Sequence, residues 1–362
     1  MSRDEQHMRR ALELGRKGYG KSSPNPMVGA VVVKGGRMIG EGWHRRAGAA
    51  HAEVAAIQVA GDCRGATLFV TLEPCNTHGR TPPCVEAIIQ AGIRRVVVAA
   101  TDPNPLHAGR AFRRLRRAGV KVAKGILAAE ATELNTAFNH WIVHGTPLVT
   151  VKAAMTLDGR IATASGESKW ITGPAARREG HRLRKGSDAI LVGINTVLAD
   201  DPGLRVKGKL KARPLRRIIL DSSARIPLKS QVLNDDLADA TTVVVTKEAP
   251  ARRIKALGDR ALVAPAKKGR VDLRWLLQRL GREEVASLLV EGGGEVNASF
   301  LEAGLAQRVA FFYAPKIIGG DDARRAVAGR GARNLAEVMR LENPQWLRVG
   351  ADLMLTARVA AA

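Results

Sequence analysis

The chain has 362 residues, enough for about two domains at roughly 150 residues each. Hydrophobic residues make up 45% and charged residues 25%, a globular composition that excludes a disordered or fibrous protein. No apolar run approaches the ~20 residues that span a bilayer, and the N-terminal residues lack the apolar core of a signal peptide. We therefore expect a cytoplasmic protein.

The net charge is +24, and it is spread along the chain. Residues 1–147 carry 21 basic and 11 acidic residues, and residues 148–362 carry 37 and 23, which gives +10 and +14. Such a surface favours anions, from nucleic acid to phosphorylated metabolites, although an arginine-rich proteome would give the same excess. Aromatic residues are only 4%, so stacking platforms for single-stranded nucleic acid are scarce.

The first 147 residues predict one alternating α/β domain of three layers. Ser2 and Glu5 resemble a capping box at the first helix, and Gly35-Gly36 predicts a turn between two strands. The predicted helices cover residues 3–17, 51–60, 83–91 and 112–118. The predicted strands cover residues 28–33, 37–43, 67–72, 94–100 and 120–124.

The pattern restarts after Thr146-Pro147, which predicts a second α/β domain over residues 148–362. Pro174 at a first helical turn and Asp272 before an apolar run mark two helix starts. The predicted helices cover residues 174–185, 273–280 and 296–303. The predicted strands cover residues 148–155, 189–192, 217–220, 242–246, 287–290 and 309–315, of which the last closes the domain.

The first chemical signal is a set of metal-binding residue types. His51 stands at a predicted helix start, Cys75 follows a strand, and Cys84 begins another helix. One imidazole and two thiolates make a catalytic zinc site with an open fourth position, where zinc can lower the pKa of bound water to about 7. The alternatives are a closed structural zinc site or buried core thiols. Cys63 lies outside the pattern.

Glu53 lies two positions after His51, and on a regular helix the two side chains would point well apart. It is therefore better placed as a proton shuttle beside the metal than as a ligand. The order H-x-E…P-C…C is the signature of zinc-dependent nucleoside and base deaminases.

The segments around this pattern make the resemblance specific. Eight residues separate Cys75 from Cys84, where the common deaminase spacing has two. This insert (NTHGRTPP) occurs together with Pro24-Asn25-Pro26, TLEPC at 71–75, TDPNP at 101–105 and AGR at 108–110. In these segments, and on through the second half, the chain resembles the family of bifunctional riboflavin biosynthesis deaminase/reductases.

The resemblance implies a cytidine deaminase-like three-layer α/β/α domain, followed by a dihydrofolate reductase-like α/β domain. The first would hydrolytically deaminate 2,5-diamino-6-ribosylamino-4(3H)-pyrimidinone 5′-phosphate. The second would use NADPH to reduce the ribosyl chain to ribityl, giving 5-amino-6-ribitylaminouracil 5′-phosphate. The implied zinc ligands are His51, Cys75 and Cys84, with Glu53 as proton donor and Asn25 orienting the substrate. Relatives usually have Pro where Ala50 stands, a change that removes no ligand.

The residues of the second half give weaker signals on their own. Glu291-Gly292-Gly293-Gly294 follows an apolar strand and opens a helix, so its backbone N–H groups could approach a phosphate. The segment is not G-x-G-x-x-G, so a Rossmann site is unsupported, and an ordinary strand-to-helix turn is the alternative.

The resemblance assigns reductase residues one by one. It places NADPH against Ala154, Trp170, Thr196, Asp200, Ser222, Gly293, Gly294, Glu295, Val296, Asn297, Ala298 and Ser299. It places the sugar-phosphate substrate against Ser168, Arg184, Leu204, Lys207 and Glu291. Many relatives have Arg where Lys207 stands, and lysine lacks bidentate phosphate geometry.

Hydride is expected to pass from the nicotinamide to C1′ of an open-chain imine, with a proton needed nearby. Asp200 and Lys152 are the candidates to steer or supply that proton. A helix or turn cap for Asp200 and a solvated strand end for Lys152 are the alternatives.

Two other functions remain open. A zinc deaminase acting on tRNA or DNA would explain the charge and would bind with a steep salt dependence. A structural zinc module with a ligand-binding partner domain would need no catalysis. The resemblance favours the enzyme, with Zn²⁺ and NADPH as cofactors. The expected partners are a phosphorylated pyrimidine and further copies of the chain, with no nucleic acid and no membrane.

Overall fold

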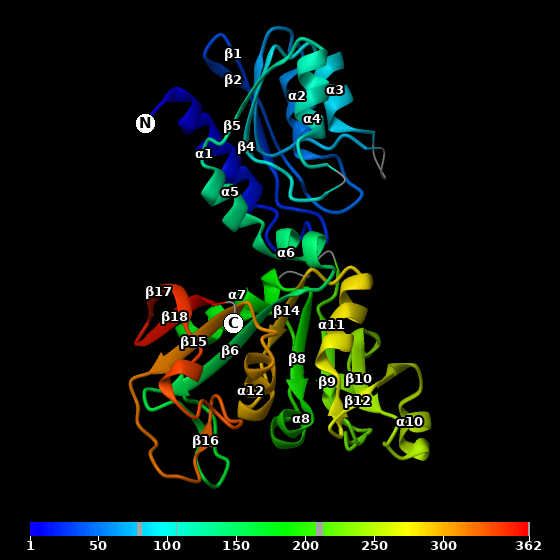
Figure 1. Cartoon of the computed structure of the whole chain (residues 1–362), viewed down its shortest axis with the longest axis vertical. Helices are drawn as coiled ribbons and strands as arrows, with labels where there is room; N and C mark the ends of the chain where they lie inside the picture. The colour runs from blue at the N-terminus through cyan, green and yellow to red at the C-terminus, as the bar shows by residue number, and fades with distance from the viewer. Residues whose placement is uncertain (78–81, 106, 208–212, 361–362) are drawn as a thin grey trace. The chain divides into compact units, whose positions relative to one another are not determined.

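The computed structural model describes residues 1–77, 82–105, 107–207 and 213–360. The chain divides into two compact units, Met1–Gly145 and Thr146–Ala362 (Figure 1). Among the described residues, no helix combines the length and the apolar character needed to cross a bilayer.

The first unit is built on a five-stranded sheet in the order β2-β1-β3-β4-β5. Its strands are β1 (Gly29–Lys34), β2 (Arg37–Trp43), β3 (Thr67–Leu72), β4 (Arg95–Ala100) and β5 (Lys121–Lys124). Its helices are α1 (Arg3–Arg16), α2 (Ala52–Ala60), α3 (Cys84–Gln90), α4 (Arg110–Arg117), α5 (Ala128–Leu134) and α6 (Thr136–His144). The antiparallel β1–β2 hairpin adjoins β3, while β3, β4 and β5 run parallel.

Helices cover both faces of this sheet, with α2, α3 and α4 on one side and α1 and α5 on the other (Figure 1). Gly40 and Gly42 of β2 let α2 approach closely, because a Cβ at either position would collide with the backbone oxygens of Ala56 or Ala52. The three-layer expectation is confirmed. Sequence patterning did not predict α5 and α6.

The second unit has a nine-stranded sheet in the order β11-β10-β9-β8-β14-β6-β15-β18-β17. The strands are β6 (Leu148–Thr156), β8 (Ala189–Gly193), β9 (Arg216–Leu220), β10 (Thr241–Thr246), β11 (Ala261–Ala264), β14 (Ser287–Val290), β15 (Arg308–Ala314), β17 (Leu341–Val349) and β18 (Asp352–Val359). The pairs from β11 through β15 are parallel, and the β15–β18 and β18–β17 pairs are antiparallel. Short strands form two more pairs, β7 (Arg160–Ala162) with β16 (Arg324–Arg325), and β12 (Ala266–Lys267) with β13 (Arg270–Val271).

Two buried layers flank the large sheet. On one face α11 (Leu273–Arg282) and α12 (Gly294–Glu302) pack into a core with β6, β8 and β14. On the other face lie α8 (Ile194–Asp200), α9 (Gln231–Asn234) and α10 (Ala251–Leu257), which contribute to a second core cluster. Helix α7 (Pro174–Gly186) packs against β15 and β18.

The end of the second unit corrects one expectation. The strand predicted over 309–315 does not close the domain, because the hairpin β17–β18 adds two antiparallel strands beside it. Pro344 hid β17, since proline breaks a strand pattern except at an edge or a bulge. Here it stands on the edge strand, within the register shift between Glu342 and Gln345.

Candidate functional sites

Three side chains of the first unit converge on one point. Nδ1 of His51 lies 3.2 Å from Sγ of Cys84 and 3.5 Å from Sγ of Cys75. The three ligand atoms all lie within 4.8 Å of one another. A nitrogen and two sulfurs form a donor set that zinc prefers, and three protein ligands leave a fourth position open. Cys63 is buried elsewhere, with its thiol facing the carbonyl of Ile57.

Two of these residues, His51 and Cys84, are positioned by the beginning of a helix. His51 is the N-cap of α2 with an extended backbone, so its ring is not bound to the helical periodicity. Cys84 is the first residue of α3, after Pro83 as N-cap, and its backbone N–H donates to Sγ of Cys75 at 3.2 Å. The pKa of the Cys75 thiol is lowered by hydrogen bonding from Cys84 and from His51, which favours the thiolate that a metal requires.

Glu53 faces the same point from the first turn of α2. It is 3% exposed, and burial raises its pKa to about 7, with the negative charge of Cys75 adding to the shift. On a regular helix His51 and Glu53 would point apart, but His51 precedes the helix, so the two can meet at one centre. A carboxyl group with a pKa near neutrality can both accept and donate a proton.

A buried histidine fixes the orientation of Asn25. Nδ1 of His44 lies 3.2 Å from the carbonyl oxygen of Ala50, which can only accept, so Nδ1 carries the hydrogen. Burial lowers the pKa of His44 and favours the neutral ring, whose Nε2 then accepts from Nδ2 of Asn25 at 3.0 Å. Oδ1 of Asn25 is thereby left as an acceptor. The rings of His44 and His51 meet edge to face at 5.2 Å.

Glu73 links the metal-binding segment to the loop before α4. Its carboxylate accepts from the backbone N–H groups of Asp102 at 3.3 Å, Gly109 at 2.9 Å and Ala111 at 3.1 Å. Since Glu73 lies two residues before Cys75, these hydrogen bonds hold the segment that carries Cys75 against residues 102–111. Sequence patterning assigns no role to His44, or to Glu73 beyond its place in the TLEPC segment at 71–75. Of the insert between Cys75 and Cys84, residues 78–81 lie outside the described residues.

In the second unit, Lys152, Arg184 and Glu291 form a partly buried ion cluster. Arg184 donates from Nε and Nη2 to the two carboxylate oxygens of Glu291 at 2.7 and 2.8 Å, and Nζ of Lys152 lies 3.5 Å from Oε2. Burial alone would raise the pKa of Glu291, but the charges of Lys152 and Arg184 hold it at about 2. These residues come from β6, α7 and the turn after β14.

A buried arginine holds the neighbouring loop, which contains Leu204 and Lys207. Arg217 is fully buried and donates to the carbonyl of Gly203 at 3.0 Å and to both carboxylate oxygens of Asp235 at 2.8 Å. Arg184 donates to the carbonyl of Arg205 at 3.1 Å, which ties the loop to the ion cluster. Leu204 is buried and Lys207 is exposed.

Asp200 and Trp170 belong to a separate, more open group. Nζ of Lys169 lies 3.1 Å from Asp200, so Asp200 is engaged with Lys169 whereas Lys152 is engaged with Glu291. Trp170 is 64% exposed, with the guanidinium of Arg177 at 4.6 Å from its ring centroid. Such an aromatic face is accessible to a planar ligand.

The remaining predicted positions differ in how open they are. Gly293 has open space where a Cβ would stand, whereas a Cβ on Gly294 would collide with the carbonyl of Arg325. Asn297 is buried and donates to the carbonyl of Ala326 at 2.8 Å, and the hydroxyl of Ser222 accepts from the N–H of Val271 at 3.3 Å. Partly or fully exposed positions are Ala154, Ser168, Thr196, Glu295, Val296 and Ser299, and Ala298 is buried.

The fold and the zinc-type donor set define a deaminase of the cytidine deaminase type joined to a second α/β unit. Residues 1–100 match the cytidine and deoxycytidylate deaminase zinc-binding region, and residues 147–355 match the RibD C-terminal domain.

Relatives extend this likeness over nearly the whole chain. The chain is 43% identical over 356 residues to riboflavin biosynthesis protein RibD of Actinobacillus pleuropneumoniae, covering 97% of this chain and 94% of that protein. The solved structure of RibD from Acinetobacter baumannii, form 1, is similar with a TM-score of 0.89 and 38% identity over 99% of both chains. A Thermotoga maritima diaminohydroxyphosphoribosylaminopyrimidine deaminase/5-amino-6-(5-phosphoribosylamino)uracil reductase gives a TM-score of 0.85 and 36% identity over 99% of both.

The chain belongs to the RibD family of riboflavin biosynthesis proteins. It is a bifunctional deaminase and reductase that acts on a small pyrimidine and uses zinc and NADPH. The predicted family, fold class and cofactors are confirmed.

Proposed function

We propose that His51, Cys75 and Cys84 hold the zinc and that Glu53 moves the proton in the deamination of 2,5-diamino-6-ribosylamino-4(3H)-pyrimidinone 5′-phosphate. The convergence of one imidazole nitrogen and two sulfurs beside a buried carboxyl group carries this proposal. Zinc bound there supplies a Lewis acid that activates water.

Glu53 accepts a proton from the attacking water and passes it to the ring nitrogen. It then accepts the proton of the newly added hydroxyl group and passes it to the amine, which departs as ammonia. Its burial supports this role, because a carboxyl group of raised pKa is protonated readily and gives the proton up again near neutral pH. Asn25, whose amide is oriented by His44, presents Oδ1 as an acceptor to an N–H group of the pyrimidine.

In the reductase unit, we infer that Arg184, Glu291, Leu204, Lys207 and Ser168 receive the sugar phosphate. Support comes from the ion cluster and from the loop that Arg184 ties to it. Lys152 faces Glu291 as a cation, so it can hold and deliver the proton that accompanies hydride transfer. Asp200 orients the nicotinamide end through its pair with Lys169.

The NADPH assignment is supported by open surface around the turn after β14. Gly293 leaves room for a phosphate at the start of α12, and the exposed ring of Trp170 offers a planar face. Ala154, Thr196, Ser222 and residues 293–299 complete the proposed contacts. Gly294, Asn297 and Ala298 act through their backbone and packing, because their side-chain positions are buried.

We propose further that the chain works as a homo-oligomer with a deaminase domain at residues 1–147 and a reductase domain at 148–362. Strand β17 supports self-association: it is an edge strand, exposed along its length, and it carries Trp346 and Leu347 at 57% and 55% exposure.

We place this enzyme in the cytoplasm with a small phosphorylated pyrimidine, not nucleic acid or a membrane, as its substrate partner. The free thiols of Cys63, Cys75 and Cys84 suit a reducing compartment. On the basic helix α4, Arg114 is already held by Glu86 at 2.8 Å and Asn76 at 3.1 Å.

The direct test is to incubate the full chain with the diaminopyrimidinone ribosyl phosphate, with and without NADPH. Ammonia release in both reactions, followed by loss of nicotinamide absorbance only with NADPH, is the expected result. Asp200→Asn is expected to slow NADPH oxidation while ammonia release continues. Absence of ammonia release from zinc-loaded protein would overturn the deaminase assignment.

A further inference from the structure

Arg217 of β9 is fully buried, and all five of its N–H donors are used. Nε donates to the hydroxyl of Thr241 at 2.8 Å, and Nη1 and Nη2 each donate to one carboxylate oxygen of Asp235 at 2.8 Å. The two remaining N–H groups donate to the carbonyl oxygens of Gly203 at 3.0 Å and Val232 at 2.9 Å. Because a buried charge requires such pairing, the guanidinium fixes the backbone at Gly203 together with the carboxylate.

Asp235 connects Arg217 to the loop over residues 201–207. Nη2 of Arg205 lies 2.9 Å from Oδ2 of Asp235, the oxygen that also accepts from Nη1 of Arg217. Hydrogen bonding from Arg217, together with its charge and a hydrogen bond from Arg205, holds the pKa of Asp235 at about 2. The carboxylate is therefore ionised at neutral pH and binds both arginines.

The same loop contacts the ion cluster through its backbone. The carbonyl oxygen of Arg205 accepts from Nη1 of Arg184 at 3.1 Å, while Nε and Nη2 of Arg184 donate to Glu291 at 2.7 and 2.8 Å. Arg184 is thus oriented by two partners, of which one belongs to the loop. Leu204 and Lys207, the proposed substrate contacts of the loop, lie immediately before Arg205 and two residues after it.

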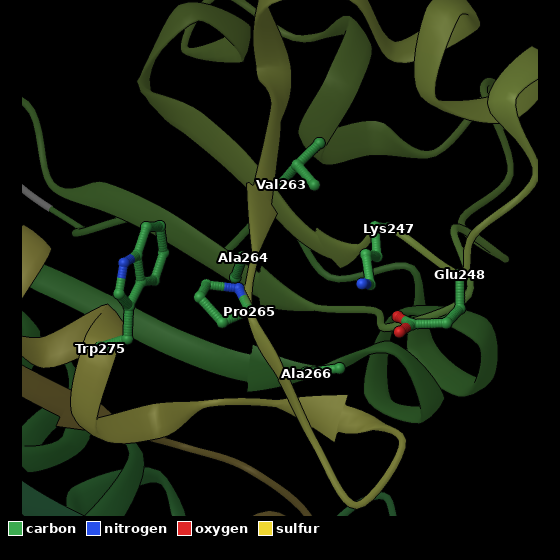
Figure 2. A pocket seen from close by; sticks show the side chains of 7 residues that line it. All are labelled: Lys247, Glu248, Val263, Ala264, Pro265, Ala266 and Trp275. Atoms are coloured by element: carbon green, nitrogen blue, oxygen red, sulfur yellow. The ribbon is translucent and has the colours of Figure 1, made fainter.

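This network is separate from the cavity of the second unit. Arg217 pairs with Thr241 at the amino ends of β9 and β10. A cavity of about 600 Å³ opens instead at the carboxyl ends of β10 and β11, where Figure 2 shows Lys247 and Trp275 in its lining. Every N–H donor of Arg217 is directed at residues outside that lining. Changes to the network therefore leave the cavity lining intact.

We propose that Arg217 is a positioning residue of the reductase reaction, acting through Asp235 and the loop over residues 201–207 on Arg184. A guanidinium with every donor engaged holds the loop backbone in one arrangement before the sugar phosphate arrives. Less ordering entropy is then lost on binding, which lowers the KM for that substrate. This inference rests on the proposed contacts of Arg184, Leu204 and Lys207 with the substrate.

Steady-state kinetics of the full chain, with the deaminated substrate and NADPH varied separately, test this role. We expect Asp235→Asn to raise the KM for the deaminated substrate about tenfold, the effect of one hydrogen bond to a charged group, with the KM for NADPH unchanged. Arg217→Lys should do the same, because an ammonium group keeps the charge but lacks the planar fork of five donors. Arg205→Gln keeps the backbone carbonyl and should raise the same KM by a smaller factor.

Thr241→Val is the matched structural control. It removes the acceptor for Nε of Arg217 but leaves the donors to Gly203 and Asp235 in place. The temperature of thermal unfolding should therefore fall while the KM for the deaminated substrate stays unchanged. Asp239→Asn, at an exposed aspartate, controls for the loss of negative charge.

Thermal unfolding of each variant shows whether it is folded, and if Arg217→Lys is not, Asp235→Asn and Arg205→Gln decide the outcome. An unchanged KM for the deaminated substrate in these folded proteins would overturn the positioning role alone. An equal rise of KM in Thr241→Val would also overturn it, because overall stability would then set the KM. A wild-type chain that fails to oxidise NADPH with the deaminated substrate would instead overturn the proposed reductase function.

Discussion

The proposed deaminase centre and the proposed reductase centre are built from different kinds of residue. In the first, one imidazole and two thiols lie within 4.8 Å of one another, and all come from residues 51–84. In the second, Lys152, Arg184 and Glu291 come from three distant segments and are common ion-pairing residues. Metal chemistry requires particular residue types, whereas hydride transfer is done by the cofactor and requires mainly orientation. The first centre is therefore sensitive to residue identity, and the second to geometry.

The largest effect is expected at a metal ligand. Cys75→Ser should lose zinc and abolish ammonia release while the reductase keeps its activity, because the ligands lie in the first unit only. The zinc content and the rates of ammonia release and NADPH oxidation test this prediction. Cys63→Ser is the matched control, since that thiol lies outside the cluster and should leave zinc content unchanged. Full zinc occupancy in Cys75→Ser would refute its role as a ligand.

Glu53→Gln should separate metal binding from proton transfer. We expect stoichiometric zinc but a rate of ammonia release lower by about 10³-fold, because the amide cannot carry the proton. Glu130→Gln, an exposed position on α5, should behave as wild type. If Glu53→Gln turned over normally, the shuttle would have to be another group.

Glu291→Gln tests whether the reductase centre depends on its charge balance. Removing the carboxylate leaves Lys152 and Arg184 unpaired and partly buried, which should cost about 3 kcal/mol of unfolding free energy at pH 7. Hydrogen exchange of the backbone amides of β6 and β14 in the full chain measures this loss of stability. Glu295→Gln, at an exposed position of α12, is the control.

The difference in unfolding free energy between wild type and Glu291→Gln should depend on pH, and the pKa of Glu291 gives the direction. The pKa of Glu291 is about 2 in the fold against an ordinary value of 4.5, so the unfolded chain binds more protons between these values. The stabilisation is complete above pH 4.5 and is lost as the pH falls toward 2. The difference between wild type and Glu291→Gln should therefore shrink in acid; a constant difference would contradict the ionised state.

The smallest effect concerns the orientation of Asn25. His44→Phe should raise the KM of the deaminase about tenfold, the effect of one misdirected hydrogen bond, with zinc retained. Asn25→Ala should raise the KM by a similar factor. The double variant should have a KM only slightly higher than either single variant, because both residues act through the amide of Asn25. Additive losses would mean that His44 acts only on local stability.

Much of the first centre could be predicted from sequence, and the reasons are local. His51, Glu53, Cys75 and Cys84 stand at strand ends and helix starts, where short-range signals set their position. Regular helix geometry, however, predicts that the side chains of His51 and Glu53 point apart. The structure differs because His51 is the N-cap, a distinction of one residue that periodicity does not resolve.

Long-range features were hidden for a physical reason. Nothing in the sequence around Arg217 distinguishes it from other arginines. In the structure it is fully buried and donates hydrogen bonds to Gly203 and Asp235. Strand β17 carries a proline and no alternation, so only its pairing with β18 reveals it. The carboxylate of Glu73 likewise gains its partners from backbone N–H groups 29 to 38 residues away along the chain.

The sequence by itself determined the two α/β units, the metal donor types and the family, because these depend on residue identity and short spacing. Only the tertiary structure decided which cations face Glu291 and which amide atom Asn25 presents. Those outcomes depend on burial and on partners from distant segments, and both exist only after the chain has folded.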